Sequence, residues 1–242
     1  MISNPIKRQL LLATVVSVAL SGCGSDSDDL PPPSPPPEPP PPAPVMVSYE
    51  VTLTNLTNAQ PFSPAAIILH AEGQLFAVGE PASQAIEVMA EGGDNSQLIA
   101  LDIALSAVSG VAPIGPGNNE TITVTVEDTT DALLSITTML VNTNDAFTGL
   151  NAISLSELAV GDSWMTTTVA YDAGTEANSE AQGTIPGPVD GGEGYNATRD
   201  DVDYVAMHGG VVTGDDGLMD SVLTVQHKFD NPVMRVVVTR IE

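Results

Sequence analysis

The chain has one cysteine, few basic residues and few aromatic residues. Because Cys23 is alone, no disulfide can form within the chain, so the fold must depend on packing or on a bound metal. Lysine and arginine together number 6 against 31 aspartates and glutamates, which gives a formal net charge of -25. Such a chain repels nucleic-acid phosphates, so we expect no nucleic acid among its partners. Aromatic residues make up 4% of the chain, so its core must be mostly aliphatic.

The N-terminal residues follow the pattern of a bacterial export signal. Lys7 and Arg8 precede an apolar run, Leu10 to Leu20, that is shorter than the roughly 20 residues of a membrane span. The sequence Leu20-Ser21-Gly22-Cys23 then resembles the lipobox of lipoproteins, in which the cysteine is lipidated. The alternative is a stray thiol in an ordinary signal peptide. We predict that Cys23 carries lipid and is the membrane contact of the mature protein.

A proline-rich tether follows the predicted lipid anchor. Pro31 to Pro44 is almost pure proline, so it must adopt polyproline II and form a stiff spacer of roughly 43 Å. Gly24 stands where an inner-membrane lipoprotein usually has aspartate, which favours the outer membrane of a diderm bacterium. We therefore divide the chain into a lipoprotein signal peptide (1–22), a lipid-anchored linker (23–46) and a folded domain (47–242).

The folded domain has the pattern of a mainly β protein. Alternating or fully apolar runs predict strands at Val47–Thr54, Ala65–His70, Thr121–Val126, Leu133–Val141, Trp164–Ala170 and Pro232–Ile241, with short pieces near Ile153, at Val202–Met207 and at Leu223–Gln226. Helices are predicted at Pro81–Ala90 and, with apolar spacing that suits either period, at Gln97–Ala107, and a surface loop at Glu176–Asp200. Many strands with little helix predict an antiparallel β-sandwich of about eight strands, and we expect a monomer.

Acidic residues stand in two loops that follow predicted strands. Asp172 and Glu176 lie four residues apart around Gly174, which lets the backbone turn sharply. Asp145 stands in another loop, after the strand that ends near Val141. We predict that the three carboxylates converge on one hard cation, while the alternative is that they are solvated loop acids.

Other acids and the histidines carry weaker signals. Further aspartates cluster at Asp200, Asp201 and Asp203 and at Asp215, Asp216 and Asp220, without the spacing of an EF-hand. Asp215-Asp216-Gly217 is most simply a turn. His208-Gly209-Gly210 is similar to an oxyanion-hole loop, but no Gly-x-Ser-x-Gly elbow accompanies it. His70 ends an apolar run and is predicted to be a satisfied, partly buried residue. We therefore predict no catalytic residue.

Several segments, taken in order, resemble bacterial spondin-domain proteins. Tyr49 to Thr57, Gln60 to Pro64 and His70 to Gly73 match the beginning of that pattern. Met139 to Gly149 (MLVNTNDAFTG) resembles the family's Met…Ser-Pro-Asp-Trp-Phe-x-Gly segment, and Tyr171 to Glu176 resembles its Trp-Asp-Ala-Gly-Thr-Asp segment. The resemblance covers about residues 47–242 and extends to the spondin domain of F-spondin.

The resemblance implies a C2-like or immunoglobulin-like sandwich that binds calcium through loop acids and acts in adhesion. Carried over by motif, Asp145, Asp172 and Glu176 are the implied calcium ligands. The chain departs from the family at Ala146, where the motif has Trp, at Glu176, where it has Asp, and in lacking the cysteines of the animal domain. Calcium accepts glutamate for aspartate because its coordination is flexible.

Two functions remain open from the sequence. The first is a non-catalytic, calcium-binding module, anchored at the surface or envelope, that binds a protein or glycan ligand. The second is an envelope hydrolase or glycan-acting enzyme with an unrecognised site. The absence of a recognisable pair of base and nucleophile favours the first.

Overall fold

The computed structural model describes residues 38–127 and 131–242. The chain consists of two units, Met1–Pro42 and Ala43–Glu242. The predicted signal peptide, the predicted lipidation site at Cys23 and the first part of the tether lie outside the described residues. Residues 38–45 are exposed and contain no helix or strand. No helix in the described ranges is both long and apolar enough to span a bilayer.

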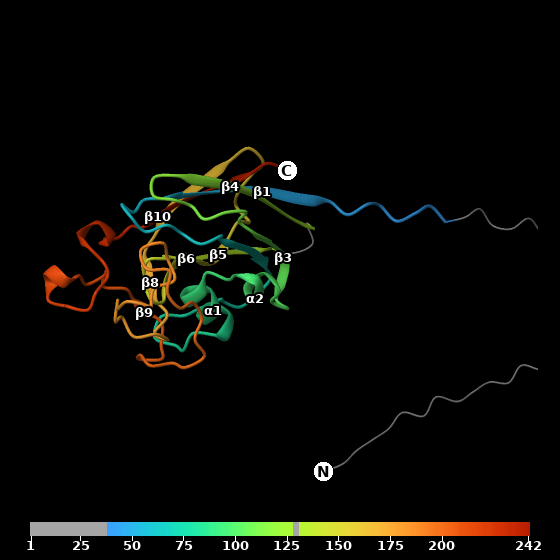
Figure 1. Ribbon diagram of the computed structural model, residues 1–242. Coiled ribbons are helices and arrows are strands. Elements are labelled where there is room, and N and C mark those ends of the chain that lie inside the picture. Colours follow the sequence, from blue (N-terminus) through green and yellow to red (C-terminus); the bar gives the residue numbers. More distant parts are fainter. Residues whose placement is uncertain (1–37, 128–130) are drawn as a thin grey trace, which may run out of the picture. The chain divides into compact units, whose positions relative to one another are not determined.

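The unit Ala43–Glu242 is a sandwich of two antiparallel sheets (Figure 1). One sheet has the order β4 (Asn119–Glu127), β1 (Met46–Asn55), β10 (Met234–Arg240), β7 (Ser163–Thr168). The other has the order β3 (Ala104–Ser109), β2 (Ala66–His70), β5 (Leu133–Met139), β6 (Ala146–Ser154), β8 (Ala170–Asp172), β9 (Ala206–Met207). The predicted antiparallel β-sandwich is confirmed, with ten strands over the described residues where about eight were expected.

The main core fills the space between the sheets and is almost entirely aliphatic. Val51 and Leu53 of β1 point inward, as the alternation of this strand predicts, and both are fully buried. They belong to one apolar cluster with Ile136 of β5 and Val236 of β10. The prediction of an aliphatic core is therefore confirmed.

The central strands β2 and β5 of the six-stranded sheet are buried on both faces. In β2, Ile67 and Leu69 belong to the core between the sheets, whereas Ala66 and Ile68 belong to a second apolar cluster. That cluster includes residues of α1 (Gln84–Gly92), which Figure 1 shows on the side of this sheet away from the four-stranded sheet. A strand covered on both faces needs apolar residues throughout, which explains its continuous apolar sequence.

Helix α1 confirms the helix predicted at Pro81–Ala90. The Ser83 hydroxyl accepts a hydrogen bond from the Ile86 amide at 3.3 Å and caps the N-terminus. Gly93 ends the helix with a φ of 69°.

The second predicted helix, Gln97–Ala107, is wrong for most of its length. Only α2 (Ser96–Ile99) is helical there, and β3 follows at Ala104–Ser109. The apolar residues of this segment fit either period, and β3 completes an edge of the sheet by pairing with β2, for example Val108 with Ile67. These tertiary hydrogen bonds decide the outcome against a local helix.

Several boundaries also differ from the prediction. The predicted strand Trp164–Ala170 is divided between β7 and β8, which belong to different sheets. The piece near Ile153 is part of the nine-residue β6, and the piece at Leu223–Gln226 overlaps a 3-10 helix, η2 (Val225–His227). Another 3-10 helix, η1 (Gly214–Asp216), ends at Gly217, so the chain turns at Asp215-Asp216-Gly217 as predicted.

Candidate functional site

The pairing of β6 with β8 places two of the three predicted acids beside each other. Asp145 directly precedes β6, Asp172 is the last residue of β8, and Ala146 pairs with Asp172 in the sheet. Asp145 is fully buried and Asp172 is 8% exposed. The alternative of solvated loop acids is therefore wrong for these two residues.

The Asp145 carboxylate holds the start of the loop that follows β8. Its Oδ2 accepts hydrogen bonds from the Thr175 amide at 2.8 Å, the Glu176 amide at 3.1 Å and the Thr175 hydroxyl at 3.3 Å. Its Oδ1 is buried and has no hydrogen-bond partner among the described residues. A buried acceptor without a partner costs about 1–3 kcal/mol, and more if it is charged.

Asp172 shapes the same loop by a different arrangement. Its Oδ1 accepts from the Gly174 amide at 2.8 Å and its Oδ2 accepts from the Asn178 side chain at 2.7 Å. The bond from Gly174 is that of an Asx-turn, and the bond from Asn178 occupies the second oxygen.

A second loop, residues 200–204, lies directly against the first. The Asp203 amide donates to the Gly174 carbonyl at 2.7 Å, and the Asp200 amide donates to the Thr175 carbonyl at 3.1 Å. Gly174 has a φ of 70°, and a Cβ there would lie 2.3 Å from the Tyr204 carbonyl oxygen. Only glycine allows this approach, so the order of one loop depends on the other.

Glu176 projects from this loop as a half-buried carboxylate. Its Oε1 accepts a hydrogen bond from the Asn144 side chain at 3.1 Å, while its Oε2 is buried without a partner in the described part of the chain. Burial, followed by repulsion from Glu91, Asp145 and Asp200, raises the pKa of Glu176 to about 8.

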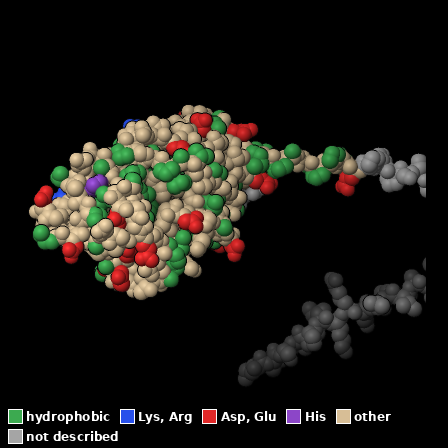
Figure 2. All heavy atoms as spheres, in the orientation of Figure 1, with side chains coloured by type: hydrophobic (Ala, Val, Ile, Leu, Met, Phe, Trp, Pro, Cys, Tyr) green, Lys and Arg blue, Asp and Glu red, His purple; other side chains and the backbone are tan. Residues whose placement is uncertain are grey.

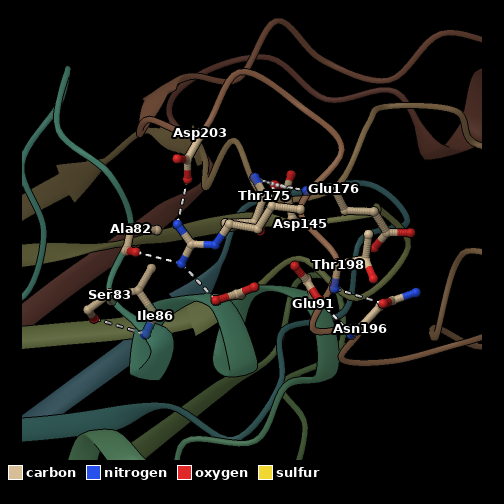
Figure 3. Close-up of polar contacts among 12 residues, drawn as sticks. Ala82, Ser83, Ile86, Glu91, Asp145, Thr175, Glu176, Asn196, Thr198 and Asp203 are labelled. Carbon is tan, nitrogen blue, oxygen red and sulfur yellow. Dashed lines mark hydrogen bonds and ion pairs between the residues drawn. The ribbon is translucent and has the colours of Figure 1, made fainter.

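A fourth acid, Glu91, was not predicted from the sequence. It lies near the end of α1 and is 1% exposed; its Oε2 accepts from the Asn196 amide at 2.8 Å, and its Oε1 has no partner within residues 38–127 and 131–242. In Figure 3 its carboxylate lies in the same region as Asp145 and Glu176. The only sequence signal was a glutamate among the apolar residues of a covering helix. We call Asp145, Glu176 and Glu91 the acid cluster.

The acid cluster has little compensating positive charge among the described residues. Burial, together with repulsion from Asp172, raises the pKa of Asp145 to about 7, and burial also raises the pKa of Glu91. The guanidinium of Arg199 forms an ion pair with Glu87 at 2.7 Å and another with Asp203. These carboxylates therefore retain protons to a higher pH than exposed acids do, and a bound cation would favour their ionised forms.

The chemistry of the acid cluster fits a hard cation. Its unpartnered oxygens are carboxylate oxygens, which are the ligands that calcium prefers. Within the described ranges, however, no three His, Cys, Asp or Glu side chains are already arranged around one metal position. Binding would therefore require the flexible glutamate side chains to turn.

Three residues of the other aspartate clusters, Asp200, Asp203 and Asp216, have structural partners. Asp200 accepts from the Ala177 amide at 2.9 Å, and Asp203 pairs with Arg199. Asp216 accepts from the Thr213 amide and hydroxyl and from Lys228 at 2.6 Å, and the Lys228 ammonium holds the pKa of Asp216 down at about 2.

Two histidines are buried in different surroundings. His70 contacts the Ser135 hydroxyl and the Glu72 carbonyl, each at 2.8 Å, and is fully buried, so its predicted role as a satisfied residue is confirmed. His208 accepts from the Gly210 amide through Nδ1 at 3.0 Å, which leaves Nε2 buried without a partner among the residues that the structure describes. Burial lowers the pKa of His208, so the ring is neutral near pH 7.

One surface cleft, of about 340 Å³, lies in another part of the sandwich. It is lined by Ser154, Leu155, Glu157, Leu158, Asp162, Ser163 and Trp164. No residue of the acid cluster and no histidine lines it. The acid cluster and this cleft therefore do not form one site.

Comparison with known protein families finds no match for the chain. Comparison with curated proteins finds no matching relative. The resemblance to spondin-domain proteins therefore stays a prediction.

Proposed function

We propose that the folded domain is a non-catalytic binding module whose loops are ordered by calcium. The observation that carries this proposal is the fully buried Asp145, whose Oδ1 has no partner among the described residues and whose negative charge is opposed by that of Asp172. Asp145 and Glu176 are its candidate ligands, and Asp172 is their predicted companion from the sequence motif. Calcium supplies the positive charge that these carboxylates lack.

Calcium at this position would act on recognition through the two loops. The loop that contains Gly174 and Thr175 receives hydrogen bonds from residues 200–204. That second loop carries the exposed side chains of Val202 and Tyr204. Figure 2 shows that hydrophobic side chains, in green, are scattered over one face of the molecule. A cation that fixes Asp145 and Glu176 therefore also fixes this exposed surface, which we propose binds an envelope or extracellular protein or glycan.

We further propose that the protein works at the cell envelope. The lipobox-like sequence before Cys23 and the proline-rich tether support a lipid-anchored protein, held away from the outer membrane of a diderm bacterium. Replacing Cys23 by Ser should release the protein from the membrane fraction. Unchanged fractionation would contradict the anchor.

One observation favours the alternative, an envelope hydrolase. Asp145 and Glu176, with pKa values of about 7 and 8, have the raised values typical of general acids and bases. Asp145 has no exposed surface, however, and the cleft beside Trp164 does not include it. The binding module is therefore the better supported proposal.

Calcium titration of the purified full-length chain tests the metal. Binding measured by calorimetry should saturate at one equivalent and should be lost in Asp145→Asn, which keeps the shape of the side chain. Equal effects of calcium, magnesium and simple ionic strength would mean that the cations only screen the negative charges and that no specific calcium site exists. Capture of envelope or matrix components by the domain, with and without a chelator, then tests recognition.

A further inference from the structure

Helix α1 turns two glutamates inward, and within the described residues only one of them has a counter-ion. Glu87 is 4% exposed and Glu91, one turn later, is 1% exposed. Glu87 is paired with Arg199 at 2.7 Å, whereas Glu91 receives the neutral Asn196 amide on Oε2. An ionised carboxylate buried without compensation is costly, so Glu91 is stabilised either by a proton or by a positive group close to it.

The position of Thr175 shows that Glu91 faces the predicted metal ligands. The Thr175 hydroxyl donates to Asp145 Oδ2 at 3.3 Å, and the same hydroxyl lies near enough to Glu91 to lower its pKa. Glu176 follows Thr175 in the chain and is repelled by both Glu91 and Asp145. Three carboxylates from α1, from the residue before β6 and from the loop after β8 therefore lie in one region, although within the described residues they are not already arranged around one metal position (Figure 3).

The unpartnered oxygens of this region do not include those of Asp172. Among the described residues they are Oδ1 of Asp145, Oε2 of Glu176 and Oε1 of Glu91, all buried. Asp172 uses its two oxygens on Gly174 and Asn178. The oxygens that remain free to bind a cation therefore belong to Asp145, Glu176 and Glu91, and not to Asp172.

We infer that Glu91 is a ligand of the same calcium ion as Asp145 and Glu176, and that Asp172 positions the loop without binding the ion directly. This inference rests on the proposed calcium site and changes its ligand set. Three carboxylates give a high ligand charge, and sites with more charged ligands bind calcium more tightly than sites with fewer. The ion would then link α1, which packs on the six-stranded sheet, to the loop after β8. Through that loop it would also stabilise the exposed surface at residues 200–204.

Calorimetric calcium titrations of four full-length proteins at pH 8 test the inference. They are the wild type, Glu91→Gln, Asp172→Asn and Glu80→Gln, the last removing an exposed glutamate as a control for net charge. We expect Glu91→Gln to raise the Kd at least about tenfold, as loss of a charged ligand does, and Asp172→Asn to raise it less. Glu80→Gln should leave the Kd unchanged.

Thermal melting in chelator separates a ligand from a structural residue. Because the glutamine side chain has no charge, Glu91→Gln should melt at the same temperature as the wild type or higher without calcium, and should lose the rise in melting temperature that calcium produces. Lower melting in chelator together with an intact calcium response would overturn the inference. Loss of binding in Asp145→Asn with normal binding in Glu91→Gln would overturn it while preserving the proposed site. No saturable binding by the wild type would overturn both.

Discussion

The apolar core between the sheets and the acid cluster are both buried, but their stability depends on different quantities. Leu53 and Ile136 are stabilised by removal from water and by close packing, which need no ion and no proton. The acid cluster instead holds Asp145 and its neighbours away from water with oxygens that have no partner among the described residues. The core therefore specifies the sandwich, whereas we propose that the acid cluster makes the loop after β8 responsive to cations and pH.

The largest expected effect is on the free energy of unfolding, when a residue of the core between the sheets is truncated. Leu53→Ala should lower the free energy of unfolding by about 2–5 kcal/mol, because it leaves a cavity at a fully buried position. Urea unfolding should give this loss equally with calcium and with chelator. Leu56→Ala, at a position 42% exposed, is the matched control and should change stability by less than about 1 kcal/mol. A calcium-dependent loss at Leu53 would show that the two regions are not separable.

The next largest effect is expected from a substitution that disrupts the contact between the two loops. Gly174→Ala should cost about 1–3 kcal/mol, because alanine disfavours the positive φ and its Cβ would meet the Tyr204 carbonyl oxygen. The change should also weaken calcium binding, which titration would measure. Gly183→Ala is the control, since Gly183 has a φ of 91° but open space around its Cβ position. Equal costs at the two glycines would mean that the loop contact adds nothing.

The pH dependence of stability distinguishes the acid cluster from the apolar core without any mutation. The pKa of Asp145 rises from 3.8 to about 7 and that of Glu176 from 4.5 to about 8, so the folded protein retains protons that the unfolded chain releases. Without calcium, stability should be greatest in acid and fall by on the order of 1 kcal/mol per pH unit as pH rises toward these values. Melting curves between about pH 5 and 8 would measure it.

Saturating calcium should flatten the part of this decline that comes from Asp145 and Glu176, since the ion replaces their protons. The part that comes from Glu180, whose pKa burial also raises to about 7, should persist. Stability that rises with pH in chelator would contradict the raised pKa values.

The smallest expected effect concerns the helix that carries Glu91. Ser83→Ala removes the hydroxyl that caps α1 and should cost about 1 kcal/mol. Hydrogen exchange should show faster opening of α1, and bound calcium should restore part of the protection if Glu91 is a ligand. Identical hydrogen exchange in α1 with and without calcium would show that calcium does not stabilise this helix, which would contradict Glu91 as a ligand.

The sandwich could be predicted from the sequence because its strands carry their own pattern. The alternation around Val51 and the continuous apolar run at Ile67 and Ile68 each correspond to one kind of strand environment. The segment at Ala104–Ser109 could not be assigned in this way, because its spacing fits a helix as well and only pairing with β2 decides.

The candidate site was predictable only where its residues lie on loops between strands. Asp145, Asp172 and Glu176 stand near strand ends, and the pairing of β6 with β8 brings the first two together. Glu91 could not be found, because its contact with Thr175 joins distant segments of the chain and depends on how α1 packs on the sheet. Burial of Asp145 likewise follows from tertiary packing and has no local signal.

The most direct test of this account is the melting temperature at pH 8, in chelator and in saturating calcium, of the wild type and Asp145→Asn. With free calcium at about one hundred times the Kd, the wild type should gain about 2.7 kcal/mol of stability and melt at a higher temperature. Asp145→Asn should gain nothing, and in chelator it should melt at or above the wild type because it no longer buries an unpartnered charge. An equal calcium response in both proteins, or the same response to magnesium, would contradict a calcium site at the acid cluster.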